Sequence, residues 1–313
     1  MKDLDEYMER KVEEIYGKTI RRRAPVRNPR VAKRILEDEY KLVVDEKTIT
    51  LVYAAFYNGR PVLFEGPPGT GKTEIGQALL ELWSGKEPFI LPCSENYDEY
   101  RVIGDFHPLI AMKKGFTEES FIPRPILSAL ILDTGVLIDE IRRSSEEFQN
   151  MVLDIIDKRR IIVPELKKLF KAKGLGFQVI FTSNPEDIGQ NELSDAFLRR
   201  VVRIEFSYPR RELEERIVNM RTLDKPSLPA GTVNYMVRVI DILRQSNILY
   251  KPGTSDLVEW GRLAQLVAKI LGKEKVEVDD AVEAAYAVLV KRPEDTDTVE
   301  SVLSRERDES LAG

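Results

Sequence analysis

The feature that most constrains the fold of this chain is a glycine-rich segment at residues 66–73. It reads Gly66-Pro67-Pro68-Gly69-Thr70-Gly71-Lys72-Thr73. An apolar run at 61–64 precedes it, and a helical pattern at 74–80 follows it. A strand, a glycine loop and a helix in this order form a phosphate cradle, because glycines let backbone N–H groups crowd around an anion at the positive end of the helix. We therefore predict an α/β fold that binds a nucleoside triphosphate, in preference to a plain Gly-Pro turn.

Two side chains of this segment are expected to act directly on the nucleotide and its metal. Lys72 would reach the β- and γ-phosphates, and Thr73 would offer its hydroxyl to Mg²⁺. The predicted cofactors are therefore ATP or ADP with Mg²⁺.

Composition narrows the class of protein further. The chain has 313 residues, 42% hydrophobic and 32% charged, as in a globular protein. No apolar stretch approaches the roughly 20 residues that span a bilayer, and the first residues lack the apolar core of a signal peptide, so we expect a cytoplasmic protein. Cys93 and His107 are the only residues of their kinds, which argues against disulfides, a histidine metal site or a Ser-His-Asp triad. We interpret Cys93 as a packed small residue and His107 as a structural loop residue.

Three regions follow one another along the chain. Residues 1–40 combine an amphipathic helical pattern with a basic, proline-broken stretch, which predicts an N-terminal extension that is a solvated linker or contacts a partner. The basic residues are Arg21, Arg22, Arg23, Arg27, Arg30, Lys33 and Arg34. Residues 41–209 alternate between strand-like and helix-like segments, and residues 210–313 show helical periodicity. We predict an α/β nucleotide-binding core, then a helical lid subdomain with an acidic tail.

The core is expected to contain a parallel sheet with helices on both faces. Its predicted strands are 62–65, 89–92, 135–138, 179–182 and 202–206, and its predicted helices are 48–57, 73–83, 126–132, 146–158 and 194–199. The predicted lid helices are 211–220, 232–244, 255–271, 278–290 and one near 298–307. In such a sheet, phosphate ligands bind at the carboxyl ends of the strands.

Two apolar runs in the core end in polar side chains. The run 136–138 is followed by Asp139 and Glu140, and Asn184 follows the run 179–182 after one serine. An aspartate at a strand end can hold Mg²⁺, and a neighbouring glutamate can polarise a water for attack on the γ-phosphate. The asparagine can hydrogen-bond that water or the phosphate. The plainer readings are an acidic strand end without a role and an asparagine that begins a turn.

An arginine pair, Arg199 and Arg200, precedes the last predicted strand of the core. An arginine that reaches the γ-phosphate of a neighbouring subunit would stabilise the charge of the transition state. Surface salt bridging is the plainer interpretation of such a pair.

In this order the four motifs resemble those of the AAA+ ATPases. The glycine loop is similar to Walker A, Asp139-Glu140 to Walker B, Asn184 to sensor 1 and the arginine pair to the arginine finger. Finer features resemble the MoxR branch, and within it the CoxD-like group. They are Asp139-Glu140-Ile141-Arg142-Arg143, Val102-Ile103-Gly104-Asp105, Ile162-Val163-Pro164-Glu165-Leu166 and Lys251-Pro252-Gly253 near Trp260. The resemblance covers about residues 40–290 and implies an AAA+ parallel-sheet P-loop core with a C-terminal all-helical lid.

The resemblance implies a role for each matching residue. The catalytic set would be Lys72, Glu140, Asn184 and Arg200, with Arg199 as the alternative finger, and Thr73 and Asp139 would hold Mg²⁺. One departure stands out. Many AAA+ lids place an arginine, sensor 2, where this chain reads Gly253-Thr254-Ser255-Asp256, and Arg262 lies nearly two helical turns further on.

The resemblance also implies two hairpins on the working face, at 105–123 and 160–178. The first carries a Lys113-Lys114-Gly115 turn, and the second carries Lys167, Lys168, Lys171 and Lys173 toward its tip. Positive charge at such a tip can meet an acidic partner or a phosphate backbone, or it can simply be solvated.

Three functions follow from these observations. The favoured one is Mg²⁺-dependent ATP hydrolysis that drives chaperone-like remodelling or maturation of a protein or metalloenzyme complex. The resemblance implies an oligomeric ring, expected to be a hexamer, and a partner with a von Willebrand A domain. The alternative is a DNA-acting AAA+ motor or loader, which the basic residues motivate and the net charge of −5 opposes. A nucleotide switch without hydrolysis is the third, and Asp139 and Glu140 speak against it.

Overall fold

The computed structural model describes residues 2–17, 22–94, 99–185 and 191–312. The chain divides into two compact units. The first contains Met1–Gly66 and Lys72–Phe206, and the second contains Pro67–Gly71 and Ser207–Gly313. The first unit is built around two clusters of buried apolar side chains, and the second is built around one.

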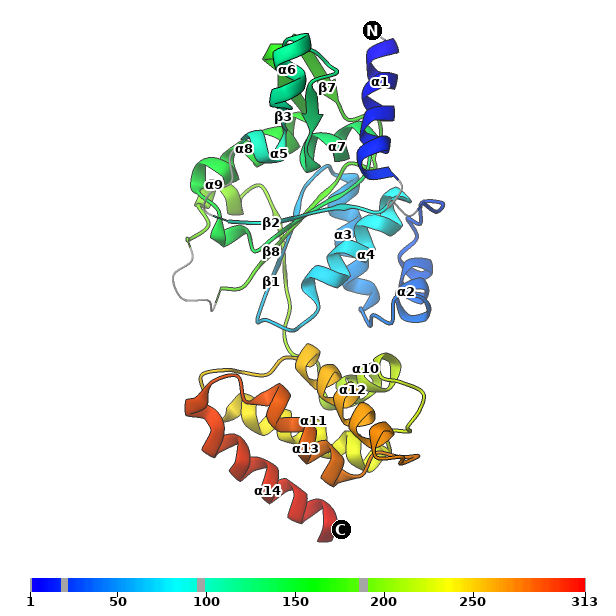
Figure 1. Cartoon of the computed structure of the whole chain (residues 1–313), viewed down its shortest axis with the longest axis vertical. Coiled ribbons are helices and arrows are strands. Elements are labelled where there is room, and N and C mark those ends of the chain that lie inside the picture. Colours follow the sequence, from blue (N-terminus) through cyan, green and yellow to red (C-terminus); the bar gives the residue numbers. More distant parts are fainter. Residues whose placement is uncertain (1, 18–21, 95–98, 186–190, 313) are drawn as a thin grey trace. The chain divides into compact units, whose positions relative to one another are not determined.

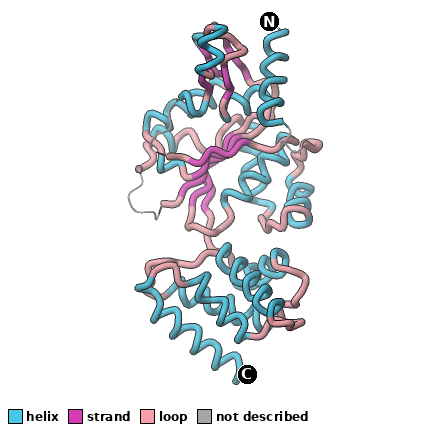
Figure 2. The backbone as a smooth tube through the Cα atoms, in the orientation of Figure 1, coloured by secondary structure: helices cyan, strands magenta, loops and turns pink. Residues whose placement is uncertain are grey.

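A five-stranded sheet forms the centre of the first unit (Figures 1 and 2). Its strands are β1 (Val62–Glu65), β2 (Phe89–Pro92), β5 (Val136–Asp139), β8 (Val179–Ser183) and β9 (Val202–Glu205). Their order is β2-β5-β8-β1-β9, and every neighbouring pair is parallel. The predicted parallel sheet is confirmed, and each predicted strand end agrees to within one residue.

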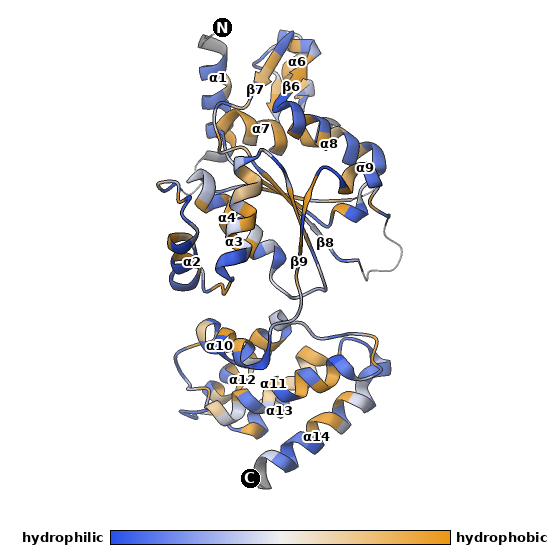
Figure 3. Ribbon diagram, turned by 180° about the vertical axis from the view of Figure 1, so that it is seen from behind, coloured by the Kyte–Doolittle hydropathy of each residue, from blue (hydrophilic) through white to orange (hydrophobic). Residues whose placement is uncertain are grey.

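Helices cover both faces of this sheet because alternate strand residues point to opposite sides. Leu63 and Phe181 belong to one buried cluster, whereas Leu137 and Ile180 belong to the other. The strands accordingly appear as apolar segments between the helices in Figure 3. The helices of this unit that pack around the sheet are α2 (Pro29–Asp38), α3 (Glu46–Tyr57), α4 (Lys72–Ser84), α7 (Pro125–Leu132), α8 (Glu146–Lys158) and α9 (Asp195–Leu198).

Short polar side chains begin several of these helices. Asn28, Asp45 and Ser145 each accept a hydrogen bond from a backbone N–H of the first turn of α2, α3 and α8, respectively. Such caps satisfy N–H groups that have no partner inside the helix. The local sequence thus determines where these three helices start.

The N-terminal region, predicted to be an extension, belongs to the first compact unit. It contains α1 (Lys2–Val12) and a π-helical turn (Glu13–Gly17) before α2. Met8 and Val12 are fully buried in one apolar cluster of the unit, and Ala32 and Leu36 are fully buried in the other. Burial of four apolar side chains ties residues 1–40 to the sheet layers. Arg21 of the predicted basic stretch lies outside the described residues.

Two antiparallel hairpins extend from the first unit at the positions expected from the sequence. The first pairs β3 (Gly104–Phe106) with β4 (Phe121–Pro123), follows the short α5 (Glu99–Val102) and carries α6 (Pro108–Lys114) between its strands. The second pairs β6 (Arg160–Val163) with β7 (Lys168–Lys171). Both hairpins lie close to α1 in Figures 1 and 3.

Every regular element described between Ser207 and Gly313 is a helix. These are α10 (Arg211–Arg221), α11 (Ala230–Gln245), α12 (Thr254–Ile270), α13 (Val278–Leu289) and α14 (Thr296–Ala312), with a 3₁₀ turn at Pro293–Asp295. Trp260 is fully buried among them and donates from its indole nitrogen to the backbone oxygen of Ala281 at 2.7 Å. The expected helical region is therefore confirmed. No helix in the described part of the chain combines the length and the apolar character needed to cross a bilayer.

Candidate nucleotide-binding site

The glycine loop connects β1 to α4, as the sequence predicts. Gly66, Gly69 and Gly71 have φ angles of 157°, 72° and 83°, a region that L side chains rarely adopt. A Cβ atom at Gly66 would lie 2.1 Å from the backbone oxygen of Phe206. The loop therefore needs glycine for its conformation and, at position 66, for space as well.

Lys72 begins α4 and has a buried side chain. Its Nζ donates a hydrogen bond of 2.8 Å to the backbone oxygen of Gly66, at the other end of the loop. The ammonium group is thus held at the loop, beside the positive end of a 13-residue helix. An ammonium group, a helix N-terminus and a glycine backbone fit the phosphate groups of a nucleotide.

Thr73 and Asp139 meet at the carboxyl ends of β1 and β5. The hydroxyl of Thr73 donates a hydrogen bond of 2.8 Å to Asp139 Oδ1. Oxygen donors of this kind are the ligands that Mg²⁺ prefers, and Mg²⁺ is usually held by one or two carboxylates together with substrate phosphates. No cluster of three or more His, Cys, Asp or Glu side chains suited to a metal occurs among the described residues. The hydroxyl of Thr73 and the carboxylate of Asp139 are oxygen groups of the kind that would hold Mg²⁺ together with phosphates.

Thr182 joins the same group of side chains, and sequence reasoning missed it. Its hydroxyl donates to Asp139 Oδ1 and accepts a hydrogen bond of 2.9 Å from the backbone N–H of Glu140. In the parallel pair of β5 and β8, Ile138 lies opposite Phe181, so Asp139 comes next to Thr182. Only the register between two strands far apart in the chain reveals this contact.

Glu140 lies directly after β5 and has a left-handed backbone with φ 56° and ψ 51°. This conformation is uncommon for a residue other than glycine and persists only where its surroundings hold it. Its carboxylate forms an ion pair of 2.9 Å with Arg143 Nε, and both side chains are about half exposed. The predicted base, Glu140, thus follows Asp139 in the chain, and its carboxylate contacts Arg143.

A buried carboxylate at the end of β1 connects the strands of the site, and it too was not anticipated. Glu65 accepts hydrogen bonds from Arg142 Nη2 at 2.9 Å and from Arg203 Nε. Arg142 also donates through Nε to the hydroxyl of Ser183 at 2.8 Å. Burial alone would raise the pKa of Glu65, but the hydrogen bonds from both arginines outweigh it and hold this pKa below its ordinary value of 4.5. The charged network fastens β1 to β9, to the end of β8 and to the turn after β5.

Asn184 and the arginine pair occupy strand and helix ends. Asn184 is buried directly after β8, where the sequence predicts it. Arg200 is exposed just after α9, and its Nε lies 3.4 Å from Asp157 Oδ2 on α8. Arg199 is exposed as well. Both arginines are therefore presented on the surface of the first unit.

The family comparison agrees with this arrangement. A family model described as an AAA domain of the dynein-related subfamily matches residues 61–201, a span that includes the glycine loop, Asp139, Glu140, Asn184 and Arg200. This part of the chain is similar to an AAA domain. This match does not distinguish the MoxR branch or the CoxD-like group within the AAA domains.

The individual relatives of this chain are distant. YehL of Escherichia coli is 26% identical over 164 residues, which cover 51% of this chain and 45% of that protein. GvpN of Ancylobacter aquaticus, named a gas vesicle ATPase, is 24% identical over 238 residues, covering 71% of this chain and 64% of that protein. The chain thus spans about half of YehL and somewhat less than two thirds of GvpN. A point mutant of Thermotoga maritima RuvB has a TM-score of 0.51 at 14% identity, covering 79% of this chain and 70% of that one, and shows the shared fold.

The segment without a sensor 2 arginine contacts the tip of the glycine loop through its main chain. Within the second unit, the N–H of Ser255 donates to the backbone oxygen of Gly69 at 3.1 Å. A Cβ atom at Gly253 would lie 2.7 Å from the Cα of Gly69. Arg262 instead donates to the backbone oxygen of Arg221 at 2.7 Å. At the place of the sensor 2 arginine, this chain therefore has a segment, 253–255, that contacts Gly69 through its backbone.

Part of the positive charge predicted on the second hairpin is already paired. Lys168 forms an ion pair of 3.1 Å with Asp5 of α1, and Lys173 forms one with Glu9 of the same helix. Of the four predicted lysines, Lys167 and Lys171 are the two to which the alternatives of solvation or partner binding still apply. The basic hairpin is thus a weaker argument for DNA binding than the sequence suggested.

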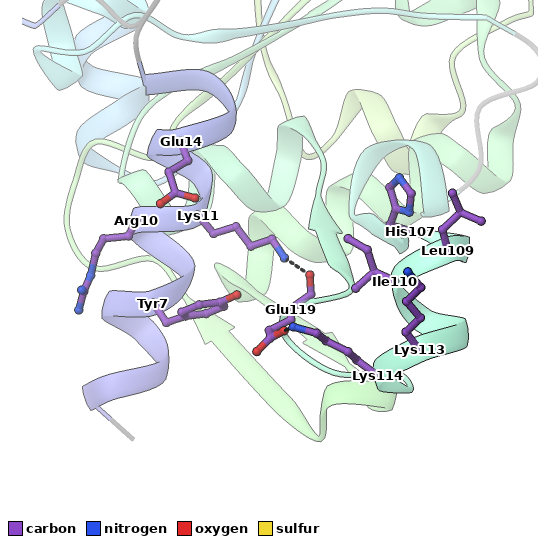
Figure 4. A pocket seen from close by; sticks show the side chains of 10 residues that line it. All are labelled: Tyr7, Arg10, Lys11, Glu14, His107, Leu109, Ile110, Lys113, Lys114 and Glu119. Atoms are coloured by element: carbon purple, nitrogen blue, oxygen red, sulfur yellow. Dashed lines mark hydrogen bonds and ion pairs between the residues drawn. The ribbon is translucent and has the colours of Figure 1, made fainter.

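A groove of about 760 Å³ lies between α1 and the first hairpin (Figure 4). Lys11 of α1 crosses it and donates to the backbone oxygens of Glu118 and Glu119 at 2.8 and 2.7 Å. His107 lies in the loop before α6 and lines the groove from that side. The lining residues are Tyr7, Arg10, Lys11, Glu14, His107, Leu109, Ile110, Lys113, Lys114 and Glu119. None of them belongs to the predicted catalytic or nucleotide-binding set.

Proposed function

We propose that this AAA+ ATPase uses Mg²⁺-dependent ATP hydrolysis to remodel or mature a protein complex, acting as a ring of identical subunits. The observation that carries the proposal is the meeting of Thr73, Asp139, Thr182 and Glu140 beside Lys72. An ATP-hydrolysing site needs a phosphate cradle, oxygen ligands for Mg²⁺ and a carboxylate beside them, and these are the groups present.

Each side chain has a task in this proposal. Lys72 binds the β- and γ-phosphates, and Thr73 and Asp139 hold Mg²⁺, which when bound neutralises charge on the phosphate oxygens. Glu140 accepts the proton of the attacking water. Asn184 orients that water or the γ-phosphate. Hydrolysis, in preference to a passive nucleotide switch, is supported by the adjacent Asp139 and Glu140.

A shared site is the second part of the proposal. Arg200 is exposed on the first unit, so it is available to the nucleotide of a neighbouring subunit. Mixing two inactive variants tests this: Lys72→Ala fails to bind ATP but keeps Arg200, and Arg200→Ala binds ATP but lacks the finger. The mixture should hydrolyse ATP faster than either variant alone. No gain in a confirmed mixed oligomer would exclude Arg200 as the finger and turn attention to Arg199, whereas Arg262→Ala serves as a control that should stay active.

A protein client is the third part, and the exposed apolar side chains of the hairpins support it. Leu109, Met112 and Phe116 of the first hairpin are 67%, 85% and 69% exposed, and Ile162 of the second is 60% exposed. Apolar side chains at such exposure gather where proteins bind other proteins. A client surface that combines apolar and acidic groups would match these residues and the lysines beside them. The resemblance to the MoxR branch adds a von Willebrand A-domain partner to the proposal, and six subunits to the ring.

The client experiment uses the Glu140→Gln variant, which should retain ATP and hold its client. The proteins that bind to Glu140→Gln in the presence of ATP are identified. They are compared with the proteins that bind, under the same conditions, to a variant that combines Glu140→Gln with Met112→Asp and Ile162→Asp. A client lost from the second variant supports the proposal. Binding of a labelled DNA oligonucleotide at low salt, weakened by Lys167→Glu and Lys171→Glu, would instead support the DNA-acting alternative.

A further inference from the structure

Thr182 is a buried threonine whose hydroxyl both donates and accepts a hydrogen bond. It lies at the fourth position of β8 and is 2% exposed. Its oxygen accepts the N–H of Glu140 at 2.9 Å, and its proton goes to Asp139 Oδ1. A hydroxyl has one proton to donate, so a single group here serves both carboxylate-bearing residues at the end of β5.

The two hydrogen bonds of Thr182 affect the orientation of the Asp139 carboxylate and of the Glu140 backbone. Asp139 Oδ1 receives a second hydrogen bond from Thr73, so two hydroxyls from different elements set the plane of this carboxylate. Glu140 has a left-handed backbone, which needs an external partner to keep it there. The hydroxyl of Thr182 supplies one such partner, through the Glu140 N–H. The direction in which the Glu140 side chain leaves the backbone thus depends on a residue of the neighbouring strand.

We propose that Thr182 is a positioning residue for ATP hydrolysis: its hydroxyl orients Asp139 toward Mg²⁺ and Glu140 toward the attacking water. The proposal rests on the proposed function and deepens it. Thr182 acts through the carboxylate of Asp139 and the backbone N–H of Glu140. Groups that hydrogen-bond the ligands of a metal fix their orientation, and their loss typically costs about 10- to 100-fold in metal affinity or activity.

The experiment compares Thr182→Val, which keeps the shape of the side chain and removes the hydroxyl, with Thr182→Ser, which keeps the hydroxyl. The matched control is Thr232→Val, since Thr232 is another buried threonine and donates to the backbone oxygen of Val276 at 3.1 Å in the second unit. Three quantities are measured on the full chain. They are the melting temperature, kcat and KM for ATP, and the affinity for a fluorescent N-methylanthraniloyl analogue of ADP with and without Mg²⁺.

Thr182→Val should lower kcat and weaken the Mg²⁺-dependent gain in ADP affinity, each by about tenfold or more, while Mg²⁺-free binding changes little. Thr182→Ser should restore most of both, and Thr232→Val should change only the melting temperature. If Thr182→Val had the same kcat and the same Mg²⁺-dependent gain in ADP affinity as the wild type, the proposal would be overturned. The hydroxyl would then have a structural role alone. If Thr182→Val does not fold, Thr182→Ala removes the hydroxyl with less bulk and is judged by the same criteria. If the wild type does not hydrolyse ATP, the proposed function fails, and the Mg²⁺-linked affinity still decides the role of Thr182.

Discussion

Thr73 and Asp139 are 66 residues apart in the chain, yet the hydroxyl of one lies 2.8 Å from a carboxylate oxygen of the other. The contact joins the first turn of α4 to the end of β5. It is produced by the parallel sheet, because the carboxyl ends of β1 and β5 face the same edge. Two motifs that are separate in the sequence thereby become one site.

The glycine at position 66 is the most constrained part of the loop. Gly66→Ala should abolish nucleotide binding and destabilise the protein by about 1–3 kcal/mol, because its Cβ would lie 2.1 Å from the backbone oxygen of Phe206. Titration with the fluorescent ADP analogue and thermal unfolding measure the two effects. Gly231→Ala is the control, since its Cβ would have nothing within 4 Å. If Gly66→Ala and Gly231→Ala had the same nucleotide affinity and the same stability, the loop would be able to accommodate a side chain at position 66.

A buried ion pair should dominate the stability of the helical unit. Arg244 contacts Glu214 through two hydrogen bonds of 2.8 and 3.0 Å, and both side chains are buried. Glu214→Ala removes the carboxylate that makes both of these hydrogen bonds to the buried guanidinium and should cost about 3–5 kcal/mol in chemical denaturation. Asp279→Ala removes the exposed pair with Arg307 and should cost no more than about 1 kcal/mol. Similar losses for the two variants would refute this ranking.

The network around Glu65 predicts a pH dependence of stability. Because the folded pKa of Glu65 lies below its ordinary value of 4.5, its charged form favours the folded state. This contribution is complete above about pH 4.5 and is lost as the pH falls through the lower, folded pKa. Denaturant unfolding of wild type and Glu65→Gln from pH 7 downward measures it. The stability difference should be constant near neutral pH and shrink in acid, and a difference that stays the same in acid contradicts the assignment.

The thiol of Cys93 should be inert in the folded protein. Burial, aided by the charges of Asp139 and Glu140, raises the pKa of this thiol to about 12. The reactive thiolate is therefore scarce at pH 8, and the side chain is also buried. A thiol-reactive dye should label the native protein far more slowly than the denatured one. Rapid labelling without denaturant would mean that the end of β2 opens readily.

The sequence predicted the parts of the site that depend on local pattern. An apolar run that ends in a polar side chain identified Asp139, Glu140 and Asn184, and the glycine spacing identified Lys72 and Thr73. These residues lie at strand ends or helix starts, so their positions follow once the elements are recognised. The roles of individual residues stay predictions until the variants are measured.

The parts that the sequence did not predict depend on contacts between distant segments. Thr182 serves Asp139 only because of the register of β8 against β5, and Glu65 meets Arg142 and Arg203 across 77 and 138 residues. No local pattern encodes such partners. For the same reason the amphipathic pattern of residues 1–15 does not reveal which apolar surface covers Met8.

The steady-state rate of ATP hydrolysis by Glu140→Gln tests the central claim most directly. The variant keeps the shape of the side chain and removes its basicity, and general-base catalysis contributes about 10²- to 10⁴-fold. Measured against wild type at saturating ATP and Mg²⁺, its turnover should fall by about 100-fold or more, with unchanged affinity for the fluorescent ADP analogue. Wild-type turnover in Glu140→Gln, with nucleotide bound normally, would contradict the assignment of this site as the centre of ATP hydrolysis.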